Sequence, residues 1–271
     1  MPELPEVETT RAGIVPHVVG RRVAQVVVRN RNLRWPIPTT LARQLTGQTV
    51  NSIRRRGKYL IIDTEAGHAL IHLGMSGSLR IVTADEAVKK HDHVDLVLDD
   101  GRALRFHDPR RFGCLLWTRK DPLSHDLLAS LGPEPLGVEF SGDYLHQKSR
   151  GRRSAVKGFI MDSHIVVGVG NIYASEALFR AGIHPKRAAG RISRQRYQAL
   201  AHSIVEVLTE AIEQGGTTLR DFVNSEGNPG YFQQTLNVYG RESEACPQCG
   251  HAIMNIVLGQ RSTYYCAQCQ T

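Results

Sequence analysis

Residues 94–106, VDLVLDDGRALRF, set two apolar runs on either side of Asp99-Asp100-Gly101. An Asp-Gly pair between apolar strands is a strong signal for a β-hairpin. Further strand-like runs lie at 23–28, 58–63, 69–73 and 79–82, and the last two flank a Gly-Met-Ser-Gly turn at 74–77. Many short strands with close turns favour an antiparallel β-sandwich over a parallel sheet.

Helical patterns lie on both sides of this β-rich block. After a linker at 131–137 with two prolines and two glycines, residues 150–240 have the pattern of helices. Ser193 is a candidate N-cap for an amphipathic run that ends at Gly215-Gly216. Before the strands, one helical face predicts a short helix that stops at Gly20; its apolar residues are Leu4, Val7, Ile14, Val15 and Val18. The predicted fold class is therefore α+β.

Four of the five cysteines form two Cys-x2-Cys pairs separated by sixteen residues: Cys246, Cys249, Cys266 and Cys269. This spacing predicts a four-thiolate site for one structural Zn2+, in which a hairpin brings the two pairs together. Two disulfides or a redox pair are the alternatives, and a cytosolic setting disfavours them. The strands of the hairpin are expected at 253–258 and 262–265. The expected tip, 259–261, holds Arg261, which is either functional or a solvated turn arginine.

The composition is globular and cationic. The 271 residues carry a formal net charge of +8, with 41% hydrophobic residues, and no apolar run approaches the length of a membrane span. The first eight residues are acidic and contain two prolines, unlike a signal peptide, so we expect a cytosolic protein. A basic excess is a weak indication of nucleic acid as partner. Basic clusters at 54–58, 110–111 and 150–157 would contact phosphates or form solvated faces.

The N-terminus offers a possible nucleophile. Removal of Met1 would leave Pro2 with a secondary amine, and chain amines have pKa values of about 8, so a useful fraction is uncharged at neutral pH. Such an amine can attack the C1′ of a deoxyribose and form an iminium, the electron sink for elimination. Glu3 and Glu6 lie within one turn, where an acid could protonate the sugar-ring oxygen, and Lys58 would add a cationic acid. The structural alternative is that proline and acidic residues simply suit a helix start.

Several motifs, in order and with compatible spacing, resemble bacterial formamidopyrimidine-DNA glycosylases. They are PELPEVE at 2–8, RGKYL at 56–60, HLGMSG at 72–77, KHDH at 90–93, DPRRFG at 108–113, VGVGNIYA at 167–174 and the four-cysteine finger. The resemblance implies a bifunctional DNA glycosylase and AP lyase of base excision repair. It would remove 8-oxoguanine opposite cytosine and formamidopyrimidines through a Schiff base, then cleave the strand by β,δ-elimination.

The same resemblance implies the fold and its domains. The family has an N-terminal β-sandwich, a helix–two-turn–helix module and a zinc hairpin, with double-stranded DNA in the cleft between. We expect a catalytic domain at 1–135, a helical DNA-binding domain at 136–240 and a zinc finger at 241–271. Nothing requires more than a monomer.

Individual roles also follow from the resemblance. Pro2 matches the nucleophile, Glu3 its neighbouring acid and Glu6 a supporting carboxylate, while Lys58 matches a phosphate contact with a role in elimination. The remaining matches are side chains that fill the gap left by the extruded base (Met75, Arg110, Phe112), DNA-backbone contacts (His91, Arg152, Asn171), a basic residue at the lesion side of the pocket (Lys157), and a phosphate-binding residue of the second elimination (Arg261).

Three alternatives remain open. The related endonuclease VIII branch prefers oxidised pyrimidines, but Leu4, Lys157 and the gap-filling set favour the purine branch. A non-enzymatic zinc-stabilised DNA-binding protein would leave Pro2 as packing, and an N-terminal-proline tautomerase would need neither the finger nor the basic clusters. Residues 217–228 are expected to form a mobile loop over the extruded base, or else an unstructured connector.

Overall fold

The computed structural model describes residues 2–215 and 236–271, which fall into two compact units. Unit 1 contains the described residues up to Ala129 together with Gln214 and Gly215, and unit 2 runs from Ser130 to Glu213 and from residue 236 to Thr271. The predicted loop at 217–228 lies outside the described residues. Within those residues, none of the helices combines the length and apolarity that a bilayer crossing demands.

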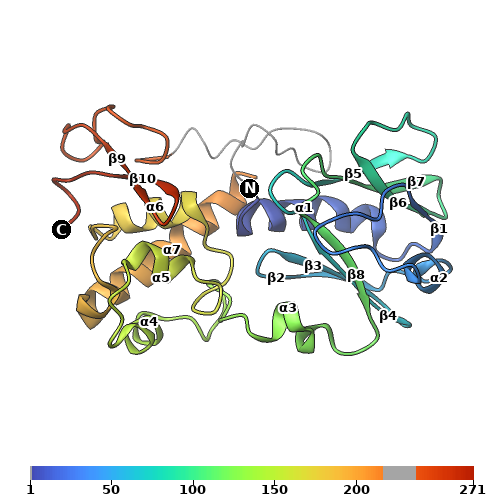
Figure 1. Cartoon of the computed structure of the whole chain (residues 1–271), viewed down its shortest axis with the longest axis horizontal. Coiled ribbons are helices and arrows are strands. Elements are labelled where there is room, and N and C mark those ends of the chain that lie inside the picture. Colours follow the sequence, from blue (N-terminus) through green and yellow to red (C-terminus); the bar gives the residue numbers. More distant parts are fainter. Residues whose placement is uncertain (1, 216–235) are drawn as a thin grey trace. The chain divides into compact units, whose positions relative to one another are not determined.

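Unit 1 contains two four-stranded antiparallel sheets (Figure 1). One has the order β1-β6-β7-β5, with β1 at Val23–Val28, β6 at Asp92–Leu98, β7 at Arg102–His107 and β5 at Ser78–Thr83. The other has the order β2-β3-β4-β8, with β2 at Ser52–Arg56, β3 at Tyr59–Thr64, β4 at Gly67–His72 and β8 at Cys114–Thr118. The predicted hairpin is β6-β7, whose register pairs Leu96 with Leu104. The antiparallel β architecture is therefore confirmed.

The N-terminal helix α1 (Leu4–Val18) contacts β2 and β3 of one sheet and β5 of the other. Its predicted apolar face is confirmed, since Leu4, Val7, Ile14 and Val18 are buried. The shared core gathers side chains of α1, both sheets and the short helix α2 (Leu41–Leu45), and burying apolar surface of this kind is the main favourable term in folding. A 3-10 turn at Pro122–Ser124 and the short helix α3 (Asp126–Ala129) follow the last strand.

Two short connections in unit 1, besides the longer one that contains α2 and links β1 to β2, pass from one sheet to the other. Residues 73–77 link β4 to β5, and residues 108–113 link β7 to β8. The Gly-Met-Ser-Gly turn is thus a crossover between sheets, not a hairpin turn between paired strands. The three gap-filling candidates of the sequence, Met75, Arg110 and Phe112, all lie on these two connections.

Unit 2 is built from helices and a terminal hairpin (Figure 1). The predicted amphipathic run is α7 (Arg194–Glu213); the Ser193 hydroxyl accepts the N–H of Arg196, and Gly215 follows with a φ of +75°. The other helices are α4 (Gly142–Ser149), α5 (Val156–Met161) and α6 (Asn171–Arg180), with a 3-10 turn at Ala189–Arg191. Contacts join α4 and α6 to α7, and α5 to α6.

The C-terminal hairpin consists of β9 (Met254–Leu258) and β10 (Arg261–Tyr265), and β10 contacts α6. The predicted tip needs one correction. Only Gly259 and Gln260 form the turn, both with positive φ (56° and 61°), and Arg261 is the first residue of β10, paired with Leu258. Two positive φ values are the geometry of the two-residue turn that suits the twist of a hairpin.

Candidate active site, DNA-binding surfaces and metal centre

The segment that leads into α1 is buried and tightly bonded. Glu3 is the N-cap of the helix: its backbone N–H donates to Glu6 Oε2 at 2.8 Å, and its side chain accepts the backbone N–H of Glu6. This reciprocal capping box satisfies two helix-end donors, so the structural reading of the acidic start is correct as far as it goes. The side chains of Glu3 and Glu6 are 3% and 0% exposed, and Pro2 is also buried. The hydrogen-bonded helix end therefore holds Glu3, the residue that follows Pro2 in the chain.

Lys58 lies in a two-residue turn between β2 and β3. Arg56 pairs with Tyr59 across the turn, and Gly57 has a φ of +57°, which favours glycine. The Lys58 side chain is half-buried and lies close enough to His72 to influence its charge. The hairpin therefore presents a cation at the end of the second sheet.

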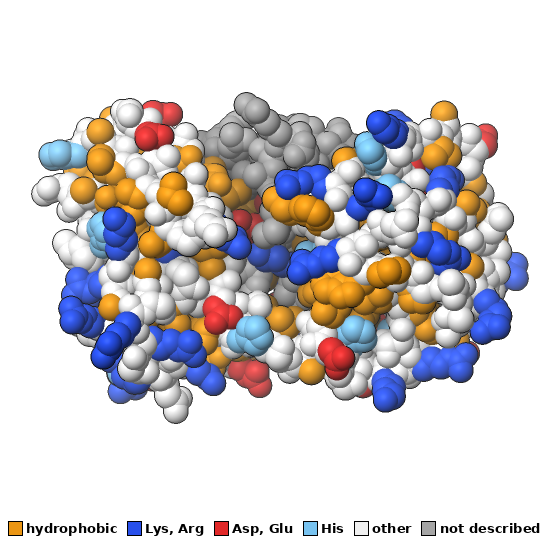
Figure 2. All heavy atoms as spheres, in the orientation of Figure 1, with side chains coloured by type: hydrophobic (Ala, Val, Ile, Leu, Met, Phe, Trp, Pro, Cys, Tyr) orange, Lys and Arg blue, Asp and Glu red, His pale blue; other side chains and the backbone are white. Residues whose placement is uncertain are grey.

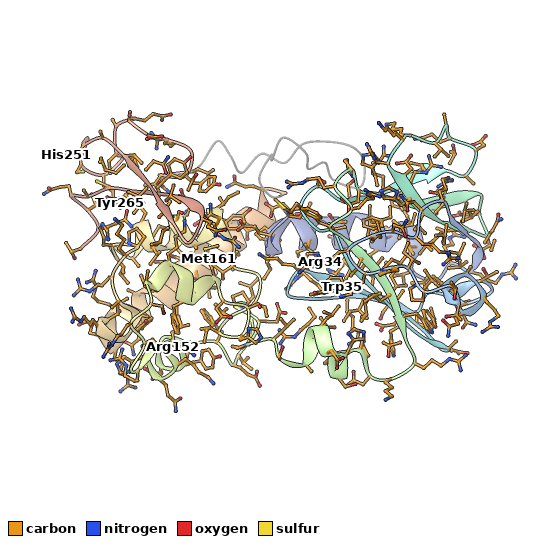
Figure 3. All side chains as sticks on the ribbon, in the orientation of Figure 1. Arg34, Trp35, Arg152, Met161, His251 and Tyr265 are labelled. Carbon is orange, nitrogen blue, oxygen red and sulfur yellow. The ribbon has the colours of Figure 1, made fainter. Side chains whose placement is uncertain are left out.

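His72 is neutral at pH 7. Burial, the charge of Lys58 and the charge of Arg34 lower the pKa of His72 to about 4. Its Nδ1 accepts the N–H of Gly74 at 2.9 Å, which places the ring proton on Nε2. The guanidinium of Arg34 stacks over the ring of Trp35 at 4.6 Å, and Figure 3 shows the two side chains together in unit 1. A positively charged edge thus surrounds an uncharged imidazole.

The gap-filling candidates form an exposed group of one cation and two apolar side chains. Met75 is 36% exposed and Phe112 is 44% exposed, while the guanidinium of Arg110 lies 4.9 Å from the centre of the Phe112 ring. Their two connections touch, because a Cβ atom on Gly74 would lie 2.5 Å from the backbone of Phe112 and Gly113. The structure therefore brings these three predicted residues together.

His91 lies beside the same group, immediately before β6. Its backbone carbonyl accepts the N–H of Asp108 at 3.0 Å. Partial desolvation and the adjacent charge of Lys90 keep the pKa of His91 below its usual range. A neutral imidazole offers a hydrogen-bonding group and not a full charge.

Arg152 follows α4 in unit 2, in an exposed basic segment. Figure 2 shows Lys and Arg side chains gathered over the part of the unit that carries α4. The guanidinium of Arg152 lies 5.9 Å from the ring of Phe159, and Figure 3 shows Arg152 below α5 in this view. Arg152, Arg153 and Arg191 line a surface hollow of about 390 Å³. Three guanidinium groups around one hollow suit a phosphate-bearing ligand.

Lys157 and Asn171 hold the zinc hairpin. Lys157, on α5, is 1% exposed, and its Nζ donates to Thr263 Oγ1 at 2.9 Å and to the Ser262 carbonyl at 3.3 Å. Asn171 opens α6, and its Nδ2 donates to the same Ser262 carbonyl at 2.9 Å. Both residues therefore hold β10 at Ser262 and Thr263, which directly follow Arg261. Arg261 itself, with Lys157, lines a hollow of about 400 Å³ at the hairpin turn.

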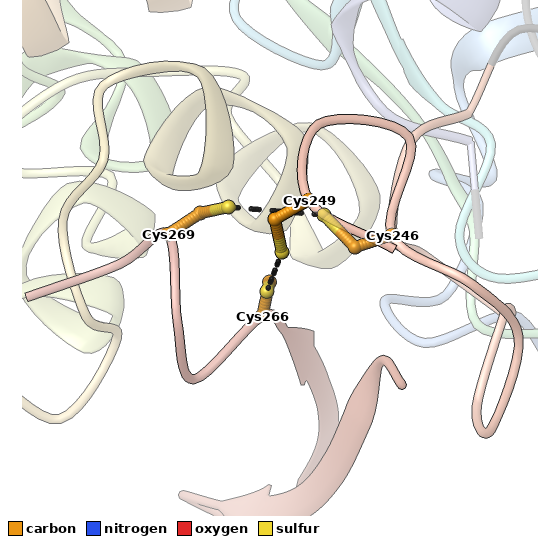
Figure 4. Close-up of side chains that lie close together, drawn as sticks. All are labelled: Cys246, Cys249, Cys266 and Cys269. Atoms are coloured by element: carbon orange, nitrogen blue, oxygen red, sulfur yellow. Dashed lines mark hydrogen bonds between the residues drawn. The ribbon is translucent and has the colours of Figure 1, made fainter. Parts of the chain in front are cut away.

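The four predicted cysteines converge (Figure 4). Their sulfurs all lie within 4.8 Å of one another, with 3.9 Å between Cys246 and Cys269 and 3.5 Å between Cys249 and Cys266. Tetrahedral Zn–S bonds of about 2.3 Å require sulfur separations of about 3.8 Å, so these residues fit a single Zn2+. Four thiolates leave no open position, so the ion is structural. The fifth cysteine, Cys114, is a buried core residue, as predicted.

Two buried carboxylates escaped the sequence reasoning. Asp108, the first residue of the 108–113 connection, is 0% exposed. Glu176, on α6, is 1% exposed and accepts the backbone N–H groups of Asn237, Val238 and Tyr239 at 2.8–2.9 Å, which anchors the chain that leads into the finger. Asp108 stands in the motif DPRRFG, but no spacing rule distinguishes a buried aspartate there from a turn-forming one.

Antiparallel sheets with a capped N-terminal helix in one unit, and helices with a four-cysteine metal site in the other, define a metal-containing protein of mixed α+β fold. Family models match along the chain: the formamidopyrimidine-DNA glycosylase N-terminal domain at residues 1–115, the formamidopyrimidine-DNA glycosylase H2TH domain at 131–223, and a zinc finger found in FPG and IleRS at 243–271. The chain belongs to the formamidopyrimidine-DNA glycosylase family.

Curated relatives and solved structures agree over the full length. The chain is 61% identical to the formamidopyrimidine-DNA glycosylase of Stutzerimonas stutzeri and 60% identical to that of Methylococcus capsulatus, with 100% of each chain covered. The MutM (Fpg) protein of Thermus thermophilus has a TM-score of 0.89 at 38% identity, covering 99% of this chain and 98% of that one. A Lactococcus lactis Fpg mutant in complex with DNA containing Fapy-dG has a TM-score of 0.92 at 34% identity, with both chains fully covered.

The activity follows from this membership. The chain is a base-excision-repair glycosylase for oxidised purines, with the abasic-site lyase activity of its family and a Schiff-base mechanism. Its partner is damaged double-stranded DNA, and one structural Zn2+ is its metal.

Proposed function

We propose that Pro2 is the nucleophile of this glycosylase and that Glu3 is its acid. The observation that carries the proposal is the capping box, in which two carboxylate side chains and the N-terminus of α1 are bonded at the entry to unit 1. The Pro2 amine attacks C1′ and the base leaves; a proton from Glu3 to the ring oxygen opens the sugar, and the iminium supports β- and then δ-elimination. Glu6 keeps Glu3 in place through the 2.8 Å bond, so its part is support.

The remaining roles are divided between the units. In unit 1, Lys58 contacts a phosphate and assists elimination, while Met75, Arg110 and Phe112 occupy the space of the extruded base, with His91 on the backbone. In unit 2, Arg152, Asn171 and Arg261 contact DNA phosphates, and Arg261 serves the second elimination. We also assign Lys157 to DNA binding. Its bonds to Ser262 and Thr263 support a contribution to DNA binding through the position of the hairpin.

Extrusion of a base costs a few kcal/mol, so a glycosylase needs groups that fill the hole it leaves. The exposed Met75 and Phe112 supply apolar surface, and the planar donors of Arg110 suit the pairing edge of the orphaned base. We propose 8-oxoguanine opposite cytosine and formamidopyrimidines as substrates. Support comes from the Lactococcus lactis Fpg structures, whose DNA contains Fapy-dG or an abasic site.

The domain division and the location are proposals of the same kind. Residues 1–135, 136–240 and 241–271 would be the catalytic, helical and zinc-finger parts, supported by family models at 1–115, 131–223 and 243–271. Chromosomal DNA as substrate favours the bacterial cytosol and nucleoid.

The test is to trap the covalent intermediate. Borohydride reduction of the protein with a duplex that contains an abasic site should give a protein–DNA adduct whose mass maps to Pro2. A variant with an uncleavable N-terminal tag should keep DNA affinity and lose the adduct and strand cleavage, because its proline nitrogen is an amide. An adduct that maps to Lys58, or full cleavage by the tagged protein, would contradict the assignment of Pro2.

A further inference from the structure

We propose that Asp108 is a positioning residue that joins the two crossover connections into one preformed wedge. The proposal rests on the gap-filling role of Met75, Arg110 and Phe112, and it assigns the residue that holds them together. Asp108 precedes Arg110 by two residues and is separated from Ser76 by 32 positions in sequence, so its contacts are long-range.

The carboxylate of Asp108 bonds to both connections. Its Oδ2 accepts the backbone N–H of Gly113 at 2.8 Å, which closes the loop that carries Arg110 and Phe112. Its Oδ1 accepts the hydroxyl of Ser76 at 3.3 Å, in the turn that carries Met75. Each oxygen therefore secures one half of the wedge.

The backbone of Asp108 adds three bonds. Its carbonyl accepts the N–H of Arg111 at 3.2 Å and the Nε2–H of His93 at 2.8 Å. Its N–H donates to the carbonyl of His91 at 3.0 Å. The same residue thus fixes the segment that precedes β6 and presents His91, together with both wedge connections.

The two connections lie so close together that side chains would not fit at two of their glycines. A Cβ atom on Gly113 would lie 2.6 Å from the His72 carbonyl and 3.0 Å from Asp108 Oδ2, and Gly74 is equally close to Phe112. Arg111 adopts a φ of +57°, a conformation that side chains rarely occupy and that the 108–113 loop imposes. The two connections therefore pack backbone against backbone at Gly74 and Gly113.

A buried carboxylate is costly unless hydrogen bonds compensate for its lost water. Asp108 is 0% exposed, as is Glu6 in α1, and both accept backbone N–H groups. We attribute the burial of this carboxylate to the need for a wedge that is ordered before DNA binds. A wedge that is already ordered loses less conformational entropy on insertion than two flexible connections would lose.

The hydrogen bonds of Asp108 go to the two connections and to the segment that presents His91, so its loss should affect wedge insertion more than bond chemistry. An abasic site has no base to extrude, so its cleavage depends less on a rigid wedge. The discriminating comparison is therefore lesion excision against abasic-site cleavage by the same protein.

The experiment uses the full-length zinc-loaded protein and a duplex with pyrrolocytosine opposite 8-oxoguanine, whose fluorescence reports insertion beside the orphaned base. Asp108→Ala should slow the fluorescence change and excision by about tenfold or more, with abasic-site cleavage changed by less than about threefold. Asp108→Asn should recover most of the insertion rate, because its amide can accept from Gly113 and donate to Ser76. Ser76→Ala, which loses one bond, should give an intermediate rate and also covers the case in which Asp108→Ala does not fold.

Asp63→Ala is the matched control. Asp63 is a buried carboxylate of the same unit that accepts from Ser52 and Arg54 at 2.6 Å, away from both connections. It should lose stability and keep the insertion rate. Normal insertion by Asp108→Ala, or an equal loss in Asp63→Ala, would overturn the proposal.

Failure of the proposed function would look different. If Phe112→Ala inserts normally, the wedge assignment is wrong; if Phe112→Ala loses insertion while Asp108→Ala keeps it, only the role of Asp108 fails.

Discussion

At the scale of single residues, the site depends on polar groups that hydrogen bonds hold inside the fold. Glu3, Glu6 and Asp108 are buried and accept backbone N–H groups, and His72 is half-buried near the charges of Lys58 and Arg34. The sequence indicated that Glu3 and Glu6 matter, because they lie within a turn of Pro2. It did not indicate Asp108 or His72, because their importance comes from contacts with Ser76 and Lys58 that lie far away in the chain.

His72 gives a prediction for stability against pH. Its pKa is about 4 in the folded protein and about 6.5 in the unfolded chain, so the unfolded chain binds more protons between those values. The stabilisation is complete above the unfolded pKa and is lost as the pH falls through 6.5 towards 4. We expect His72 to account for a loss of about 1–2 kcal/mol in the free energy of unfolding between pH 7 and pH 5.

His72→Asn is the matching variant, since its Oδ1 can accept the Gly74 N–H without titrating. Urea unfolding of both proteins at pH 7 and pH 5 measures the difference. If the variant loses as much stability as the parent over this range, His72 is not the group responsible.

At the scale of elements, local patterns predicted well and long-range pairings did not. The Asp-Gly turn between β6 and β7, the face of α1 and the face of α7 depend on neighbours in sequence, and all three are confirmed. β2 was missed because its three arginines, Arg54 to Arg56, resemble a basic cluster. Its strand character comes from pairing with β3, with Ile53 inside.

The position of the zinc hairpin depends on the metal site and on side chains of the helices. Its strands are short, and Lys157, Asn171 and Glu176 bond to it or to the chain before it, so the four thiolates complete its attachment. Cys249→Ser should lose Zn2+ and weaken binding to damaged duplex by about tenfold or more, because metal binding and folding of such hairpins are coupled.

Cys114→Ala provides the control, since it also removes a thiol but lies in the core of unit 1. Zinc content by atomic absorption and Kd by fluorescence anisotropy should be unchanged in this variant apart from any loss of stability. A full complement of zinc in Cys249→Ser would refute the four-thiolate assignment.

At the scale of the whole molecule, each unit carries an exposed arginine that stacks on an aromatic ring. Arg110 lies over Phe112 in unit 1, and Arg152 lies over Phe159 in unit 2. The net charge of +8 is compatible with nucleic acid and with several other classes of partner, because cationic surfaces are common. The motifs and the four cysteines decided between these partners, and the structure shows that Arg110 and Arg152 are exposed.

Affinity for DNA should therefore fall steeply with salt concentration. The contribution of a single arginine to this salt dependence should be measurable. Each phosphate contact contributes about 0.9 to the slope of log K against log salt concentration, through counterion release. Arg152→Ala should lower that slope by about one and weaken binding to lesion and undamaged duplexes alike. Arg194→Ala is the control, because Asp143 already pairs with that guanidinium at 2.6 Å, and its slope should match the parent. An unchanged slope in Arg152→Ala would mean that this arginine forms a solvated face and that the phosphate contacts of unit 2 lie elsewhere, with Arg261 the next residue to remove.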